Sequence, residues 1–185
     1  MLIEVPIEDR FRIWYEEPLA ELAKFKRGNG GILALIVVMP LYERAYNFED
    51  SKSNVPDGRA KWVKDDLGLK SDLEAKLFWN VFRDGFCHFG SALEVSHNKR
   101  LEGEDIPKIS LDGKHPDLPV FEDIDGKSII KLNPWGLVSH VLRKYHGQTE
   151  LLEYARAPLL PLHYLVKDKE TSSPNPDTPT NPHKD

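Results

Sequence analysis

Apolar side chains recur at helical spacing through the first part of the chain. Phe11, Trp14 and Tyr15 are spaced to share one face, which predicts a helix around them. Pro18 suits a first helical turn, so we expect a second helix to begin at Glu17-Pro18, with Leu19, Leu22, Ala23 and Phe25 as its apolar stripe. It should end at a glycine-rich loop over residues 28–31.

The next apolar segment, residues 32–47, is hydrophobic on nearly every side at first and amphipathic later, which predicts a buried central helix. Pro40 should bend this helix, because proline removes one backbone hydrogen bond. Two interpretations of Glu43 and Arg44 stay open. They form an ion pair on a solvated face, or one of them borders a site around Arg83.

Turn-forming residues over 48–58 predict a loop, and a short helix over 59–67 should follow it and end at Gly68. Ser71 is then a favourable N-cap, and Glu74 completes a capping box three residues later. The helix that starts here has a broad buried stripe, predicted to consist of Leu73, Leu77, Phe78, Val81 and Phe82.

Short β-prone runs and turn signals occupy residues 107–132. The dipeptides Asp112-Gly113 and Asp125-Gly126 lie between such runs, which is a hairpin signal. We therefore expect a small β-hairpin insertion here and not a separate domain.

After the insertion, Asn133 and Pro134 predict the cap and the first turn of another helix, which should end at Gly147. Residues 151–165 are interpreted as a helical segment broken by prolines. Proline, serine, threonine and charged residues dominate from residue 167 onward, which is typical of a flexible tail.

The composition fits one globular domain of ordinary size. The 185 residues are 40% hydrophobic and 30% charged, which is enough apolar material for a core. We expect a mainly α fold, a helical bundle with a small β-hairpin insertion. Its single domain should span residues 1–166, with 167–185 as a flexible proline-rich tail.

Charge and cysteine content limit the function classes. A net charge of -5 argues against a broad basic face for nucleic acid, and no DNA partner is expected, although a local basic cleft is compatible with this charge. The single cysteine, Cys87, excludes an internal disulfide and suits a reducing compartment. The start of the chain lacks a secretory signal, and the apolar run 31–41 is too short to cross a bilayer. We therefore expect a soluble, cytoplasmic protein with no membrane partner.

Candidate chemistry is concentrated in residues 77–90, the most apolar and aromatic stretch of the chain. This stretch also carries Arg83, Asp84 and His88, although buried charges are costly unless they are paired. Histidine exchanges a proton near neutral pH, and the planar guanidinium of arginine matches phosphate oxygens. These groups suffice to cleave a phosphodiester without a metal ion. The histidine would assist attack by a ribose 2′-hydroxyl, and the arginine would stabilise charge on the phosphate.

The spacing of these residues imposes a geometric condition. Five residues on an ideal α-helix turn through about 500°, so Arg83 and His88 would lie roughly 140° apart. Gly85 is a poor helix-interior residue and could loosen this turn. Alternatively, two copies of the motif face each other across a two-fold axis, each chain supplying its own pair.

The segment from Arg83 to His88 resembles the R-x(4–6)-H motif of the HEPN superfamily, in which a polar residue such as Asp84 follows the arginine. The resemblance implies a helical bundle that forms a homodimer, with both motifs facing one cleft. It also implies metal-independent cleavage of RNA, often in toxin–antitoxin or phage-defence systems, where an antitoxin or regulatory protein is a further partner. By this resemblance His88 is the general base or acid, Arg83 binds phosphate, and Asp84 orients them.

Two alternatives stay open beside this one. The first is a non-catalytic HEPN-like module that binds a nucleotide, RNA or another protein. In the second, Arg83 and Asp84 form a helix-surface ion pair, and His88 only interacts with the negative end of its helix. Lys99 and Arg100 are either solvated charges or an RNA-contacting rim of the site. We expect no metal ion and no cofactor, because the other histidines lack ligand-like spacing.

Overall fold

The computed structural model describes residues 2–25, 29–52, 58–89, 107–146, 148–153 and 163–165, which form a mainly helical fold with a small sheet. The predicted fold class is confirmed at this level. In chain order the elements are β1 (Leu2–Glu4), α1 (Ile7–Phe11), the π-helical η1 (Arg12–Glu16), α2 (Glu17–Leu22), α3 (Asn29–Lys52), α4 (Arg59–Leu67), α5 (Asp72–Trp79), the π-helical η2 (Asn80–Phe89), β2 (Lys108–Leu111), β3 (Val120–Ile124), β4 (Lys127–Leu132), α6 (Pro134–Tyr145), α7 (Thr149–Leu152) and β5 (His163–Leu165).

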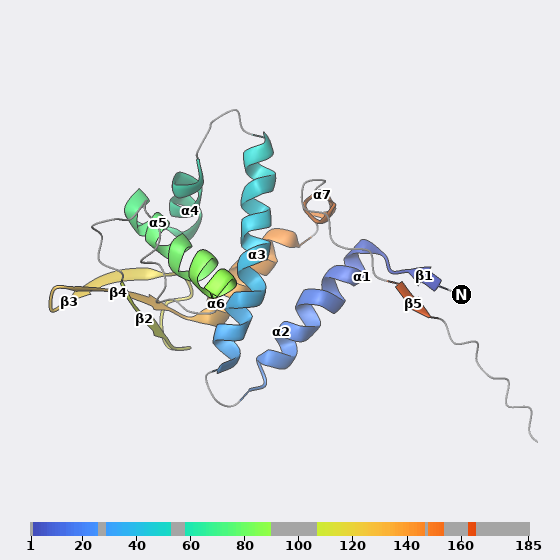
Figure 1. Cartoon of the computed structure of the whole chain (residues 1–185), viewed down its shortest axis with the longest axis horizontal. Helices are drawn as coiled ribbons and strands as arrows, with labels where there is room; N and C mark the ends of the chain where they lie inside the picture. Colours follow the sequence, from blue (N-terminus) through green and yellow to red (C-terminus); the bar gives the residue numbers. More distant parts are fainter. Residues whose placement is uncertain are drawn as a thin grey trace, which may run out of the picture.

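Helix α3 is the centre of the fold. Figure 1 shows α4, α5 and the sheet of β2, β3 and β4 on one side of α3, and α1, α2 and α7 on the other. Its fully buried side chains include Leu35, Val38 and Met39, so the predicted central helix is confirmed. The helix is longer than predicted, because it also includes the first part of the expected loop over residues 48–58.

The first turn of α3 contains Gly30 and Gly31, which the sequence had placed in a loop. A Cβ atom on Gly30 would lie 2.5 Å from the carbonyl oxygen of Leu22, at the end of α2. A Cβ atom on Gly31 would lie 3.0 Å from the ring of Pro134, at the start of α6. The glycines therefore allow two neighbouring helix ends to approach α3 closely. The loop prediction was wrong because it considered only the low helix propensity of glycine and not these contacts between helices.

Three consecutive residues of α3 attach three other elements to it. The hydroxyl of Tyr42 donates to Asp66 of α4, with an oxygen to oxygen distance of 2.7 Å. Glu43 accepts from Arg83 of η2. The buried guanidinium of Arg44 donates to the carbonyl oxygens of Leu151 and Leu152 in α7, at 3.0 and 2.5 Å. Successive residues of a helix point in directions about 100° apart, which allows one turn to reach all three elements.

The beginning of the chain follows its predicted pattern. Helical structure runs from α1 through η1 into α2, and Pro18 lies in the first turn of α2 as expected. Phe11 is buried and stacks on Tyr145 of α6, with ring centroids 5.2 Å apart. The side chain of Phe25, predicted to lie on the buried stripe of the second helix, is exposed instead.

The start of α5 confirms Ser71 as the N-cap, but the predicted capping box differs in one partner, because the Glu74 carboxylate binds the N–H of Lys70 and not that of Ser71. The Ser71 hydroxyl accepts from the backbone N–H of Glu74 at 3.1 Å, and the Glu74 carboxylate accepts from the backbone N–H of Lys70 at 2.7 Å. The prediction of a buried stripe is wrong for Leu73, which is 40% exposed. The four other members, Leu77, Phe78, Val81 and Phe82, are buried.

The predicted insertion forms a three-stranded sheet in the order β2–β4–β3. Strands β3 and β4 are an antiparallel hairpin, turned by Asp125 and Gly126 with φ angles of 56° and 72°. This turn was predicted, because Asp-Gly tolerates positive φ at both positions. Asp112-Gly113 is not a hairpin turn, since β2 pairs with β4 in parallel. The buried Ile130 and Leu132 join β4 to the core.

The last described segments differ from the helix predicted over 151–165. Helix α7 occupies Thr149–Leu152, and β5 is a strand that pairs antiparallel with β1. Figure 1 shows this two-stranded sheet beyond α1, far from the sheet of the insertion. The predicted tail over 167–185 lies outside the described residues. In the described part of the chain, no helix combines the length and apolar character needed to cross a membrane.

Replacing Gly30 with alanine should destabilise the protein, although alanine favours helix formation. The new Cβ atom would press on backbone at Leu22, and we expect a loss of about 1–3 kcal/mol in the free energy of unfolding. Urea denaturation measures this loss. Gly113→Ala is the control, because no atom lies within 4 Å of its added Cβ. Equal stability of the two variants would contradict the packing role of Gly30.

Asp66 is the polar centre between α3, α4 and α6. Besides Tyr42, its carboxylate contacts His140 Nε2 at 2.9 Å and Lys144 Nζ at 2.5 Å. Burial would raise the pKa of Asp66, but hydrogen bonds from His140, Lys144 and Tyr42 lower it below the usual value. The pKa is lower in the folded chain than in the unfolded chain. The carboxylate therefore stabilises the fold above the unfolded pKa, and this contribution is lost as the pH falls through the folded pKa.

Asp66→Asn should lower the free energy of unfolding by about 1–3 kcal/mol at neutral pH, because three donors lose their charged acceptor. The deficit should shrink as the pH falls below about 4, the pKa of an aspartate in the unfolded chain, and should vanish only below the lower pKa of the folded chain, where the wild-type carboxylate is also protonated. Urea denaturation across this pH range measures both effects. Asp65→Asn, at an exposed position on the same helix, should have little effect. A deficit independent of pH would be evidence against the proposed electrostatic role.

Candidate functional site

The motif from Arg83 to His88 lies within η2, which continues α5 and packs against α3. The buried side chains of Val81, Phe82 and Phe86 hold η2 to the core. In a π-helix the backbone hydrogen bonds join residues i and i+5, so positions 83 and 88 lie about one turn apart along the axis. The angular offset expected for an ideal α-helix therefore does not apply to this backbone.

Arg83 is held by two carboxylates. Its Nε and Nη2 atoms donate to the same oxygen of Glu43, Oε2, at 3.0 and 2.6 Å. Its Nη1 atom donates to Oδ1 of Asp84 at 3.3 Å. The side chain of Arg83 is 18% exposed, that of Glu43 is 28% exposed, and that of Asp84 is 34% exposed. The guanidinium is thus mostly buried, and water reaches both of its partners.

These contacts determine the electrostatics of the site. Burial alone would lower the pKa of Arg83, but the hydrogen bonds and charges of Glu43 and Asp84 raise it above the usual value. The guanidinium therefore stays cationic at every relevant pH. Two carboxylates around one cation give this group of three side chains a net charge of about -1 when all are ionised.

Glu43 and Arg44, both considered as borders of the site, take different roles. Glu43 lies at the site and contacts Arg83 directly. Arg44 lies elsewhere, since its buried side chain binds the end of α7. Burial lowers the pKa of Arg44, and the two carbonyl oxygens compensate for the water that it has lost.

Cys87 lies on the same helical segment as Arg83 but is half-buried against α3. Its Sγ atom is 3.9 Å from the carbonyl oxygen of Ile36 and 3.8 Å from that of Phe82. Burial raises the pKa of this thiol. The thiol is therefore protonated at neutral pH and is a poor nucleophile, because the thiolate is the reactive form.

The remaining predicted site residues are not fully described. The backbone of His88 belongs to η2, but its side chain is outside what the structure describes. Lys99 and Arg100 lie outside the described residues altogether.

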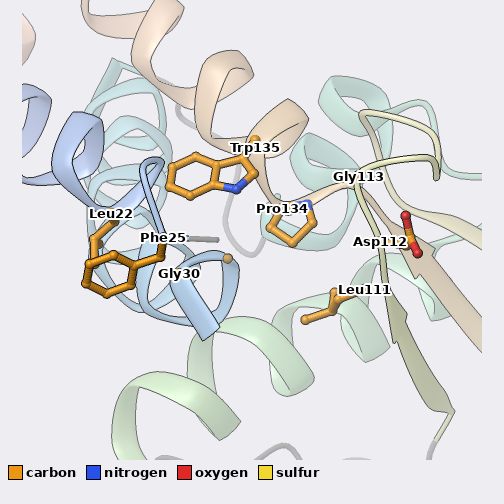
Figure 2. Close-up of a pocket in the computed structure, with 9 residues that line it drawn as sticks. Leu22, Phe25, Gly30, Leu111, Asp112, Gly113, Pro134 and Trp135 are labelled. Carbon is orange, nitrogen blue, oxygen red and sulfur yellow. The ribbon is translucent and has the colours of Figure 1, made fainter. Parts of the chain in front are cut away.

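Two pockets lie away from the motif. Figure 2 shows the first, of about 250 Å³, where Leu22 and Phe25 lie on one side and Leu111 and Asp112 on the other, and Asp112 is the one charged residue among the described lining residues. The second, of about 300 Å³, lies between the end of α3 and α4 and is lined by three carboxylates and Lys61. An excess of negative charge in each makes both unsuitable for phosphate.

The pairing of His140 with Asp66 was missed by sequence analysis. The two residues are 74 positions apart, and neither belongs to a motif, so no local signal identifies them. Among the described residues, no cluster of three or more His, Cys, Asp or Glu side chains is arranged to hold a metal ion.

Comparison of the chain with protein-family models, curated proteins and solved structures finds no match. The site is therefore interpreted from its own residues and geometry.

The contact between Glu43 and Arg83 should contribute to folding stability. Glu43→Gln and Arg83→Met should each destabilise the chain, and the double variant should lose less than the sum, with a coupling of about 0.5–2 kcal/mol. Urea denaturation of the four proteins in the cycle measures this coupling. Strictly additive losses would mean that the ion pair contributes nothing to the fold.

Proposed function

We propose that the chain is a metal-independent endoribonuclease of the HEPN type, with Arg83, Asp84 and His88 as its catalytic residues. The observation that carries the proposal is the π-helical backbone of η2, which brings positions 83 and 88 within about one turn. Such π-helical segments are rare and are frequently found at functional sites. The partly buried, permanently charged Arg83 supports the proposal further, because a desolvated cation interacts strongly with phosphate.

In the proposed reaction, His88 accepts the proton of a ribose 2′-hydroxyl, and the 2′-oxygen attacks the adjacent phosphorus. The bond from phosphorus to the 5′-oxygen breaks, the leaving oxygen takes up a proton from water, and His88 returns its own proton to the solvent. The products are a 2′,3′-cyclic phosphate and a free 5′-hydroxyl. Arg83 stabilises the negative charge that builds up on the phosphate oxygens. Asp84, which already contacts Arg83, fixes the orientation of the guanidinium.

The proposal includes further features that the HEPN resemblance implies. Two chains would form a homodimer with both motifs facing one cleft, and the protein would act in the cytoplasm as a toxin or phage-defence effector. Lys99 and Arg100 would contact RNA at the rim, and an antitoxin or regulatory protein would control the activity.

One observation favours a second candidate function. The described side chains of the site, Arg83 with the carboxylates of Glu43 and Asp84, carry a net negative charge, which weakens the attraction for RNA. The charge favours a non-catalytic HEPN-like module that binds a nucleotide, RNA or a protein, and most directly its protein-binding form, because a protein partner needs no attraction for phosphate. The two candidates differ in a single measurement, the cleavage of RNA.

Cleavage of total RNA in the presence of EDTA tests the proposal. His88→Ala should reduce the rate by about 10²–10⁴-fold, which is the usual contribution of a general acid or base. Arg83→Ala should cause a comparable loss, because it removes the charge that faces the phosphate. His146→Ala, at an exposed histidine at the end of α6, is the matched control and should cleave at the wild-type rate.

Circular dichroism must show that each variant is folded. RNA binding without cleavage by any form would favour the non-catalytic module. Cleavage that persists in both His88→Ala and Arg83→Ala would refute the assignment of the catalytic residues.

A further inference from the structure

We propose that Glu43 occupies the phosphate-binding edge of Arg83 in the free protein and must be displaced when RNA binds. Glu43 would thus be a positioning residue that also holds the site in a closed state. This inference rests on the proposed function for the identity of the ligand, an RNA phosphate. The exchange of a carboxylate for a phosphate at Arg83 can be tested separately.

The geometry of the contact supports the exchange. A guanidinium binds phosphate through two neighbouring N–H groups, and the Nε and Nη2 groups of Arg83 both donate to Glu43. Asp84 takes only Nη1, at the longer distance of 3.3 Å. An incoming phosphate would therefore compete with Glu43 for this edge, while Asp84 could keep its own contact.

The placement of Glu43 makes it the more easily displaced group. It belongs to α3, whereas Arg83 and Asp84 share η2, so Glu43 can turn away without changing the backbone of the motif. Its side chain is also more exposed than that of Arg83, 28% against 18%, so the released carboxylate can return to water. When Glu43 turns away, the Nε and Nη2 groups of Arg83 lose their carboxylate acceptor, and an anion that takes its place restores these two hydrogen bonds.

The charges of Glu43, Arg83 and Asp84 indicate how the displacement of Glu43 affects phosphate binding. With Glu43 in place, the side chains of Glu43, Arg83 and Asp84 together repel a phosphate. When Glu43 turns outward, Arg83 and Asp84 alone are neutral, and the phosphate replaces the lost negative charge. Removing the charge of Glu43 should therefore strengthen RNA binding, whereas removal of a purely structural residue would weaken it or leave it unchanged.

The test uses the full chain and a short 2′-O-methyl oligoribonucleotide, which lacks the attacking hydroxyl and cannot be cleaved. Fluorescence anisotropy should give about 3- to 30-fold tighter binding for Glu43→Gln than for wild type. The slope of log affinity against log salt should steepen by about 0.7, as for one added phosphate contact on a single strand. Glu49→Gln, an exposed position on the same helix, makes the same change in net charge and should leave both quantities unchanged.

Adding Arg83→Gln to Glu43→Gln should abolish the gain. If Glu43→Gln does not fold, Glu43→Asp carries the test, because the shorter side chain withdraws the carboxylate from Arg83 and should also tighten binding. Unchanged or weaker RNA binding by the folded Glu43 variant, together with RNA cleavage by wild type, would overturn the inference and leave the proposed function intact.

Titration with inorganic phosphate tests the carboxylate exchange at Arg83 separately from RNA binding. Titration of Glu43→Gln should shift the NMR signal of the Arg83 Nε–H group, and wild type should show a much smaller shift at the same concentration. If this shift occurs but no form binds or cleaves RNA, the carboxylate exchange stands and the proposed ribonuclease function fails. If the Arg83 signal does not respond in Glu43→Gln, the inference is wrong.

Discussion

A polar group that enters a packed protein interior has to find a partner there, and α3 meets this constraint at three consecutive positions. Tyr42, Glu43 and Arg44 extend toward α4, η2 and α7 in turn, and each binds a group that is itself partly or fully removed from water. Since an unpaired buried group costs more than a formed contact gains, these interactions mainly specify the arrangement of the helices. The position of the motif beside α3 depends on one of them.

The same constraint connects the fold to the proposed chemistry. Arg83 is kept in place because Glu43 neutralises it, yet the contact covers the edge of the guanidinium that a phosphate would need. In the proposed ribonuclease, an interaction that stabilises the free protein would therefore oppose the binding of the RNA phosphate. Such a conflict between stability and activity is common where a site contains desolvated charges.

Local signals in the sequence identified the elements that depend on local chemistry. The cap at Ser71 and the turn at Asp125-Gly126 are where they were predicted, because each follows from side chains a few residues apart. The features that were missed depend on distant segments. The glycines at the start of α3 serve its contacts with other helices, and β2, a predicted β-prone run, pairs in parallel with β4 instead of forming a hairpin at Asp112-Gly113. At the candidate site, the structure brings Glu43, which the sequence analysis considered, into contact with Arg83, but helix periodicity could not predict the π-helical backbone.

The pairing of β1 with β5 has a consequence for the synthesis of the chain. The two strands lie at residues 2–4 and 163–165. The ribosome must therefore release almost all of the described sequence before β1 can pair with β5. Helices α3 to α6 make their contacts over shorter separations and can assemble earlier. Strand β1 then stays accessible to chaperones and proteases during translation. We expect the pairing of β1 with β5 to be a late event in folding.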